Sequence, residues 1–132
     1  MAKTLTQTVL FKNTTPETLY DIYMNAKKHA SAIGSAVSIK AKEGTTFSAH
    51  GGYIKGKNFQ LTKGKHIVQS WRSADFKSGE PDSTFILKFE KKGNDALLHM
   101  VHANIPEAQF KGIKNGWNDY YWKPWKKYLT MK

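Results

Sequence analysis

The C-terminal part of the chain carries the pattern that most constrains the fold. Apolar residues recur there every three or four positions, as they do along one side of an α-helix. They are Phe110, Ile113, Trp117, Tyr120, Tyr121, Trp125, Tyr128 and Leu129. The polar side is narrow and consists of Asp119, Lys123, Lys126, Lys127 and Thr130. Most of the circumference of this long helix should therefore be covered by a large apolar surface.

Pro124 lies inside this stripe. Proline removes one backbone hydrogen bond from a helix and clashes with the preceding turn. Because Trp125, Tyr128 and Leu129 continue the same apolar phase, the pattern predicts a helix that kinks at Pro124 rather than one that ends at Lys123.

A series of strands separated by turn residues can supply the covering surface. Alternating or apolar runs bounded by Gly, Asn and Lys-rich turns predict about seven strands. The expected strands are Thr4–Phe11, Val37–Ala41, Thr45–Ala49, Tyr53–Leu61, His66–Arg72, Ser83–Glu90 and Ala96–Ala103. Consecutive hairpins form a twisted antiparallel sheet. The sequence therefore predicts an α+β fold in which a curved antiparallel sheet surrounds the C-terminal helix.

Two short helices are expected between the first two strands. In the run Thr14–Glu17, a threonine hydroxyl can cap the free amides, and Pro16 suits the first helical position. A second helix is expected over Lys27–Ile33, with Gly34 in the left-handed conformation that ends it.

Composition limits both the compartment and the chemistry. The chain has no cysteine, which excludes disulfides, thiolate metal sites and cysteine nucleophiles. Its start has no apolar leader, and no run of 18 apolar residues occurs, so we expect a cytoplasmic protein without a membrane span. The length and the 39% hydrophobic content suit one domain over residues 1–132.

The net charge of +11 raises the question of a polyanionic partner. Arg72 is the only arginine among the 21 basic residues, and the lysines scatter along the chain. Lysine is a poor choice for bidentate contacts to phosphate or guanine. We therefore expect a solvated lysine-rich surface and no nucleic-acid partner. Arg72 itself is expected to stack on an aromatic ring or to pair with a carboxylate.

Several segments resemble one known family. They are Gly44–Leu61, Ile67–Arg72, His102–Pro106 and Gly116–Pro124. The combination of Ile-Val-Gln-x-Trp-Arg with a later Gly-Trp-x-x-Tyr-Tyr-Trp is similar to the C-terminal domain of activators of the heat-shock-protein-90 ATPase, within the START-like (SRPBCC, polyketide cyclase-like) superfamily. The resemblance implies a helix-grip fold with a cavity between sheet and helix. In two-domain activators it also implies assistance to the chaperone's ATPase cycle.

The residues expected at that cavity come from three strands and the long helix. Strand alternation places Trp71 with Ile67 and Gln69 on one face, and Phe85 with Leu87 on the neighbouring strand. The candidate ligand-binding residues are Trp71, Phe85, Leu87, Met100, His102, Trp117 and Tyr121. Ordinary core packing is the alternative interpretation of this aromatic stripe, and the one that we favour.

Polar residues add one candidate and exclude several sites. His102 is in phase with Met100 and can project into the interior, either toward a ligand or as a structural histidine. The other histidines and the carboxylates are dispersed, so no metal, cofactor or catalytic residue is predicted. Asn58 and Gln60 would share a face if their strand were regular, and Gly56 hints at a bulge or a close approach.

Three functions remain open from the sequence. The first is a non-catalytic protein that holds a small hydrophobic ligand in the cavity. The alternative is a co-chaperone-like protein whose basic surface binds the heat-shock-protein-90 chaperone and modulates its ATPase. The second alternative is a cyclase- or hydrolase-like enzyme, for which fold analogy is the only support.

Overall fold

The computed structural model describes residues 2–131. Within them, seven strands form one antiparallel sheet in the order β1-β7-β6-β5-β4-β3-β2. The strands are β1 (Ala2–Phe11), β2 (Val37–Ser38), β3 (Thr46–Ala49), β4 (Ile54–Thr62), β5 (His66–Ser73), β6 (Ser83–Lys92) and β7 (Asp95–Pro106). From β2 to β7 the sheet is a simple meander, and β1 completes it by pairing with β7.

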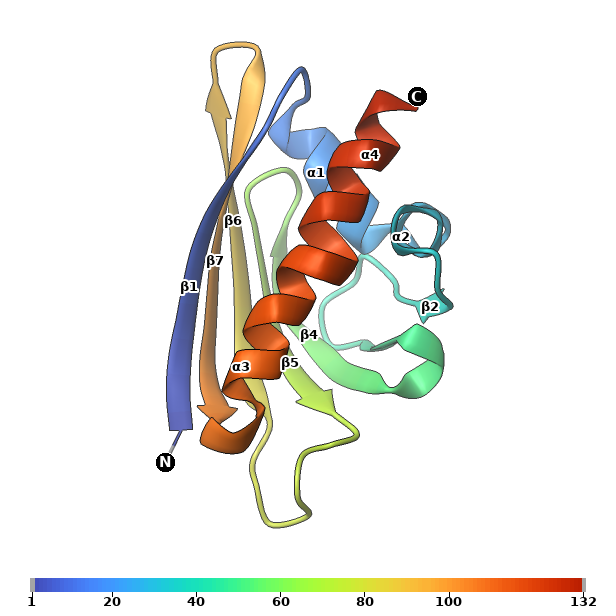
Figure 1. Ribbon diagram of the computed structural model, residues 1–132. Coiled ribbons are helices and arrows are strands. Elements are labelled where there is room, and N and C mark those ends of the chain that lie inside the picture. The colour runs from blue at the N-terminus through green and yellow to red at the C-terminus, as the bar shows by residue number, and fades with distance from the viewer. Residues whose placement is uncertain (1, 132) are drawn as a thin grey trace.

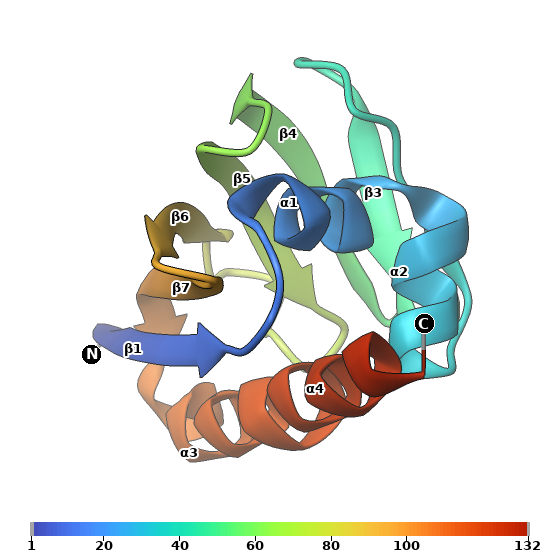
Figure 2. The same ribbon diagram turned by 90° about the horizontal axis from the view of Figure 1, so that it is seen from above.

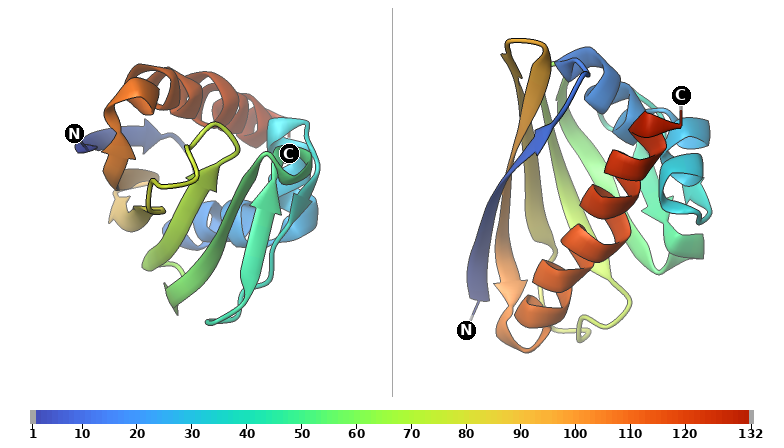
Figure 3. Two further views of the ribbon diagram at one scale, coloured as in Figure 1. Left: turned by 90° about the horizontal axis from the view of Figure 1, so that it is seen from below. Right: turned by 45° about the horizontal axis from the view of Figure 1, so that its top comes forward.

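The helices are α1 (Pro16–Met24), α2 (Ala26–Ile33), the 3-10 turn η1 (His50–Gly52), α3 (Glu107–Gly116), the π-helical segment η2 (Trp117–Trp122) and α4 (Lys123–Thr130). The last three run on from one another as a single long C-terminal helix (Figure 1). The sheet curves around this helix, while α1 and α2 lie at one end of the sheet (Figures 2 and 3). The predicted helix-grip arrangement is therefore confirmed.

Local sequence explains the two short helices. Thr15 caps α1 by accepting a hydrogen bond from the Thr18 amide at 3.1 Å, and Pro16 occupies the first turn as predicted. Asn25 caps α2 in the same way, which starts that helix one residue earlier than expected, and Gly34 ends it with φ of 69°. These caps direct the chain across the end of the sheet.

Strand β4 is irregular at Phe59. Asn58 pairs with Gln69 whereas Gln60 pairs with Val68, so β4 contains one extra residue. Asn58 keeps the inward alternation of Ile54 and is fully buried, whereas the bulge after it leaves Gln60 exposed. Gly56 marks a close approach instead, because a Cβ there would lie 1.9 Å from the Ser70 carbonyl oxygen.

The C-terminal helix continues through Pro124 as predicted, but its apolar face is partly different. In a π-helix residues five apart lie above one another, and Trp117 and Trp122 accordingly stack with ring centroids 5.5 Å apart. Trp122 is therefore buried although the predicted stripe omitted it, and Tyr120, which the stripe included, is 62% exposed. The π-helical segment lies directly before Pro124, where it accommodates the interrupted hydrogen-bond ladder.

The extent of burial also differs from the prediction. Segment α3 has no buried residue among those described, so the sheet covers one side of the helix and not most of its circumference. The buried residues of the helix come from η2 and α4, and they include Tyr121 and Trp125, whereas Phe110 and Ile113 of α3 are only partly buried against the core. Because α3 is not buried, open space remains between part of this helix and the sheet.

A candidate ligand pocket beside a packed aromatic core

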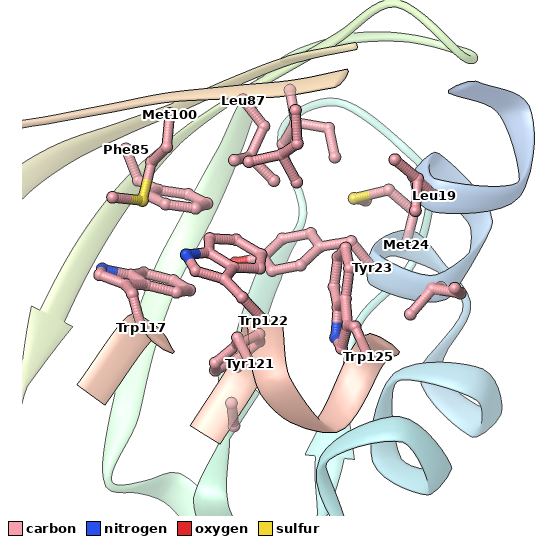
Figure 4. Packing of buried hydrophobic residues seen from close by; sticks show 14 of the residues in the cluster. Leu19, Tyr23, Met24, Phe85, Leu87, Met100, Trp117, Tyr121, Trp122 and Trp125 are labelled. Carbon is pink, nitrogen blue, oxygen red and sulfur yellow. The ribbon is translucent and has the colours of Figure 1, made fainter. Parts of the chain in front are cut away.

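The space between the middle of the sheet and the helix is filled by side chains. Phe85 and Trp117 stack almost in parallel, with ring centroids 4.5 Å apart and an interplanar angle of 5°. Figure 4 shows this contact together with Leu87, Met100 and the aromatic residues of η2. Because Phe85, Leu87 and Met100 are buried in this cluster, the core-packing interpretation describes them correctly.

His102 belongs to the same cluster and its hydrogen-bonding capacity is fully used. The Trp117 indole N–H donates to His102 Nδ1 at 3.1 Å. An indole N–H can only donate, so Nε2 carries the imidazole proton and donates to Ser83 Oγ at 2.8 Å. Ser83 in turn donates to the Trp71 carbonyl at 2.6 Å. Burial lowers the pKa of His102 to about 3, which makes it a neutral structural histidine.

A second buried histidine connects α2 to the same helix. His29 Nδ1 donates to the Tyr23 carbonyl at 2.8 Å, and the Tyr121 hydroxyl donates to His29 Nε2 at 2.9 Å. Burial lowers the pKa of His29 to about 4 and raises the pKa of Tyr121, so both groups stay neutral. The sequence analysis missed this role because its only signal, an isolated histidine in a short helix, has no defined spacing to a partner.

A third polar chain crosses the inner face of the sheet. Tyr23 donates to Gln69 at 2.9 Å, and Gln69 donates to Asn58 at 2.7 Å. Asn58 completes the chain by donating to the Lys40 carbonyl at 3.1 Å. Each of these three buried side chains thus has a hydrogen-bond partner, as a low-dielectric interior favours. These contacts fix the sheet, α1 and the β2–β3 connection relative to one another.

An open pocket of about 520 Å³ lies to one side of this packed core. Its walls come from η1, the start of β4, the end of β5, the loop after β5 and the α3–η2 part of the helix. The lining residues are His50, Tyr53, Ile54, Trp71, Ser73, Asp75, Gln109, Gly112, Ile113, Gly116, Trp117, Tyr120 and Tyr121. Of the seven predicted binding residues, Trp71, Trp117 and Tyr121 line the pocket, whereas Phe85, Leu87, Met100 and His102 do not.

The pocket exists because two residues on one side of the helix are glycines and have no side chain to fill it. Gly112 and Gly116 are four residues apart and line the same wall. A Cβ at Gly112 would meet nothing within 4 Å, so the missing side chain leaves open space there. This pair of glycines at helical spacing is the sequence signal that could have located the pocket.

Polar groups gather at one end of the pocket. The Tyr53 hydroxyl donates a hydrogen bond to the Asp75 carboxylate, and that bond raises the pKa of Tyr53. Gln109 donates to the Asp75 carbonyl at 3.4 Å. Burial lowers the pKa of His50. The pocket therefore combines aromatic walls with a few fixed polar groups, which is the usual composition of a small-molecule site.

A second hollow lies on the outer face of the sheet, away from the helix. It has about 510 Å³ and is lined by Thr46, Lys55, Gly56, Lys57, Phe59, Ser70, Arg72, Asp82, Ser83 and Thr84. Phe59 at the β4 bulge is 49% exposed there. Arg72 pairs with Asp82 at 3.2 Å and lies 5.6 Å from the Phe76 ring centroid, so both of its expected roles are present.

Residues 2–131 contain neither a metal-binding cluster nor a membrane-spanning helix. No group of three or more histidine, aspartate or glutamate side chains in this part of the chain could hold a metal ion. None of the helices described is long and apolar enough to cross a membrane.

The curved antiparallel sheet closed around a C-terminal helix defines a helix-grip protein. Residues 13–130 match the family described as "Activator of Hsp90 ATPase homolog 1-like protein". The match covers most of the chain, and the chain therefore belongs to this family. The resemblance noted from the sequence is confirmed.

Curated relatives agree with this assignment. The chain is 31% identical over 103 residues to the activator of 90 kDa heat shock protein ATPase homolog of Dictyostelium discoideum, and the match covers 77% of this chain and 27% of that protein. It is 28% identical over 120 residues to homolog 1 of Homo sapiens, with 91% and 34% covered. The chain thus spans about a third of the length of these curated relatives.

Solved structures share the whole fold. An HSP90 activator from Plasmodium falciparum superposes with a TM-score of 0.88 at 26% identity, and the match covers 96% of both chains. A protein from Mesorhizobium loti superposes with a TM-score of 0.83 at 15% identity, covering 98% of each chain, which shows the common fold alone.

Proposed function

We propose that the protein is a non-catalytic binding module whose pocket holds a small, largely apolar molecule between the C-terminal helix, the start of β4 and the end of β5. The observation that carries the proposal is an open volume of about 520 Å³ lined by Trp71, Trp117 and Tyr121. That volume lies within the usual range for small-molecule sites, about 300–1,000 Å³. The histidines of the core are neutral and already hydrogen-bonded, so no described group there acts as a free base.

The neutral fluorescent probe N-phenyl-1-naphthylamine tests this proposal. We expect saturable binding to the wild-type protein and at least about tenfold weaker binding to Gly112→Phe. Gly112 lines the pocket and a Cβ there would meet nothing within 4 Å, so we expect the added ring to take up pocket volume. Asn115→Phe is the matched control, since Asn115 is exposed on the same helix and does not line the pocket. Absence of binding to the wild type at saturating probe would contradict the proposal.

A second candidate function follows from the family: docking on a chaperone of the Hsp90 class. The outer face of the sheet favours it, because Lys55, Lys57 and Arg72 surround the exposed ring of Phe59. Basic rims with an exposed aromatic residue suit an acidic protein surface. The relatives are called activators of that chaperone's ATPase.

Titration calorimetry with a purified Hsp90-class chaperone tests the second candidate. We expect an affinity that falls as salt is added, and a loss of at least about tenfold in the double variant Lys55→Glu/Lys57→Glu. The control is Lys91→Glu/Lys92→Glu, an equal charge change at the exposed end of β6. An affinity that does not change with ionic strength would argue against docking through this face. Equal losses of affinity in the two double variants would argue against it as well.

A further inference from the structure

The charge of the pocket differs from that of the rest of the chain. Lys and Arg number 21 in the sequence against 10 Asp and Glu, yet none of the described lysines, nor Arg72, lines the pocket. Its one lining carboxylate is Asp75. Burial lowers the pKa of His50, so this imidazole adds no positive charge at neutral pH. The pocket is therefore locally acidic on a strongly basic protein.

The carboxylate is available to a ligand. Asp75 is exposed at the pocket mouth. Its side chain accepts a hydrogen bond from Tyr53, and no lysine or arginine within residues 2–131 forms an ion pair with it. The hydrogen bond to Asp75 raises the pKa of Tyr53, so the tyrosine acts as a donor to this side chain and not as a second anion.

Aromatic rings surround the same space. Tyr53 and Tyr120 are 44% and 62% exposed at the mouth, and Trp71 and Trp117 form the inner wall. The face of an aromatic ring carries a partial negative charge that attracts cations, most strongly where water is excluded. These exposed rings lie beside a carboxylate that has no lysine or arginine partner within residues 2–131. The site therefore favours a positively charged group over a neutral or an anionic one.

We propose that the pocket selects small organic cations, with a substituted ammonium group near Asp75 and the tyrosine rings and an apolar body against Trp71 and Trp117. This inference rests on the proposed binding function and names its ligand class. An anionic ligand of the same size meets the Asp75 charge with no lining lysine to compensate it.

Two probes of nearly equal shape isolate the charge. Benzyltrimethylammonium and neopentylbenzene differ in that a positively charged nitrogen replaces a carbon atom. Calorimetric titration of the wild-type protein is expected to show at least about tenfold tighter binding of the cation. In Asp75→Asn this advantage should fall by about fivefold or more, while binding of neopentylbenzene stays the same. Asp119→Asn changes the net charge equally, lies outside the pocket lining and should preserve the advantage.

The outcomes separate this inference from the function on which it rests. Equal affinity for the two probes would overturn the cation preference and leave the binding function standing. Cation binding that is identical in Asp75→Asn and Asp119→Asn would also overturn it, because the preference would then reflect no pocket carboxylate. If neither probe binds, both the proposed binding function and the cation preference are contradicted.

Discussion

Lowering the pH from about 7 to about 5 is expected to reduce the free energy of unfolding by about 4 kcal/mol, through two buried histidines. In the folded protein the pKa values of His102 and His29 are lowered from 6.5 to about 3 and about 4. Below pH 6.5 the unfolded chain therefore binds protons that the folded protein does not. Their stabilising contribution is complete above pH 6.5 and is lost as the pH falls toward the folded-state values.

Urea unfolding at the two pH values measures this loss, provided that the dependence on urea is the same at both. His102→Gln, which is uncharged at either pH, should retain only about half of the pH dependence, and His29→Gln/His102→Gln should lose most of it. Both variants are expected to be less stable at neutral pH because they remove buried hydrogen bonds. A wild-type protein of equal stability at both pH values would show that these imidazoles are not buried in neutral form.

Trp117→Ala is expected to destabilise the fold by about 4 kcal/mol. The substitution removes the stacking contacts with Phe85 and Trp122, and it takes the indole donor away from His102. Trp117→Phe keeps a ring in the stack and leaves His102 Nδ1 without a donor, so it should cost only about 1–2 kcal/mol. Thermal or urea unfolding of the two variants separates packing from hydrogen bonding.

Tyr120→Ala is the matched control for this series. Tyr120 lies on the same π-helical segment but is 62% exposed, and its removal should change stability by no more than about 0.5 kcal/mol. Similar losses for Trp117→Ala and Tyr120→Ala would contradict the burial of Trp117 and the exposure of Tyr120.

The fold could be predicted because its signals are periodic. Strand alternation placed Ile67, Gln69 and Trp71 on one face, and all three are buried. The buried face of the C-terminal helix was harder to predict, because a repeat of apolar residues every three or four positions assumes ordinary α-helical turns. The π-helical segment before Pro124 inserts a wider turn, which is why Trp122 was missed and Tyr120 was wrongly assigned to the buried stripe.

The pocket was only partly predictable for a different reason. Its wall residues come from η1, the ends of two strands, one loop and the helix. A single sequence does not show which of these segments meet. His50, Tyr53 and Asp75 lie in or beside turns, where no periodicity indicates the direction of a side chain. The predicted residues Trp71, Trp117 and Tyr121 were found because strand and helix periods place them on inner faces.

The pairing of β1 with β7 has a consequence for synthesis of the chain. Ala2 lies opposite Pro106 and Phe11 lies opposite Ala96, so the first strand cannot find its partner until the last strand has left the ribosome. During that interval β1 is an exposed strand with unpaired backbone groups, and such edges promote association between chains. Closure over so long a sequence separation also slows folding. Until β7 is present, the backbone groups of β1 therefore have no partner strand in this sheet.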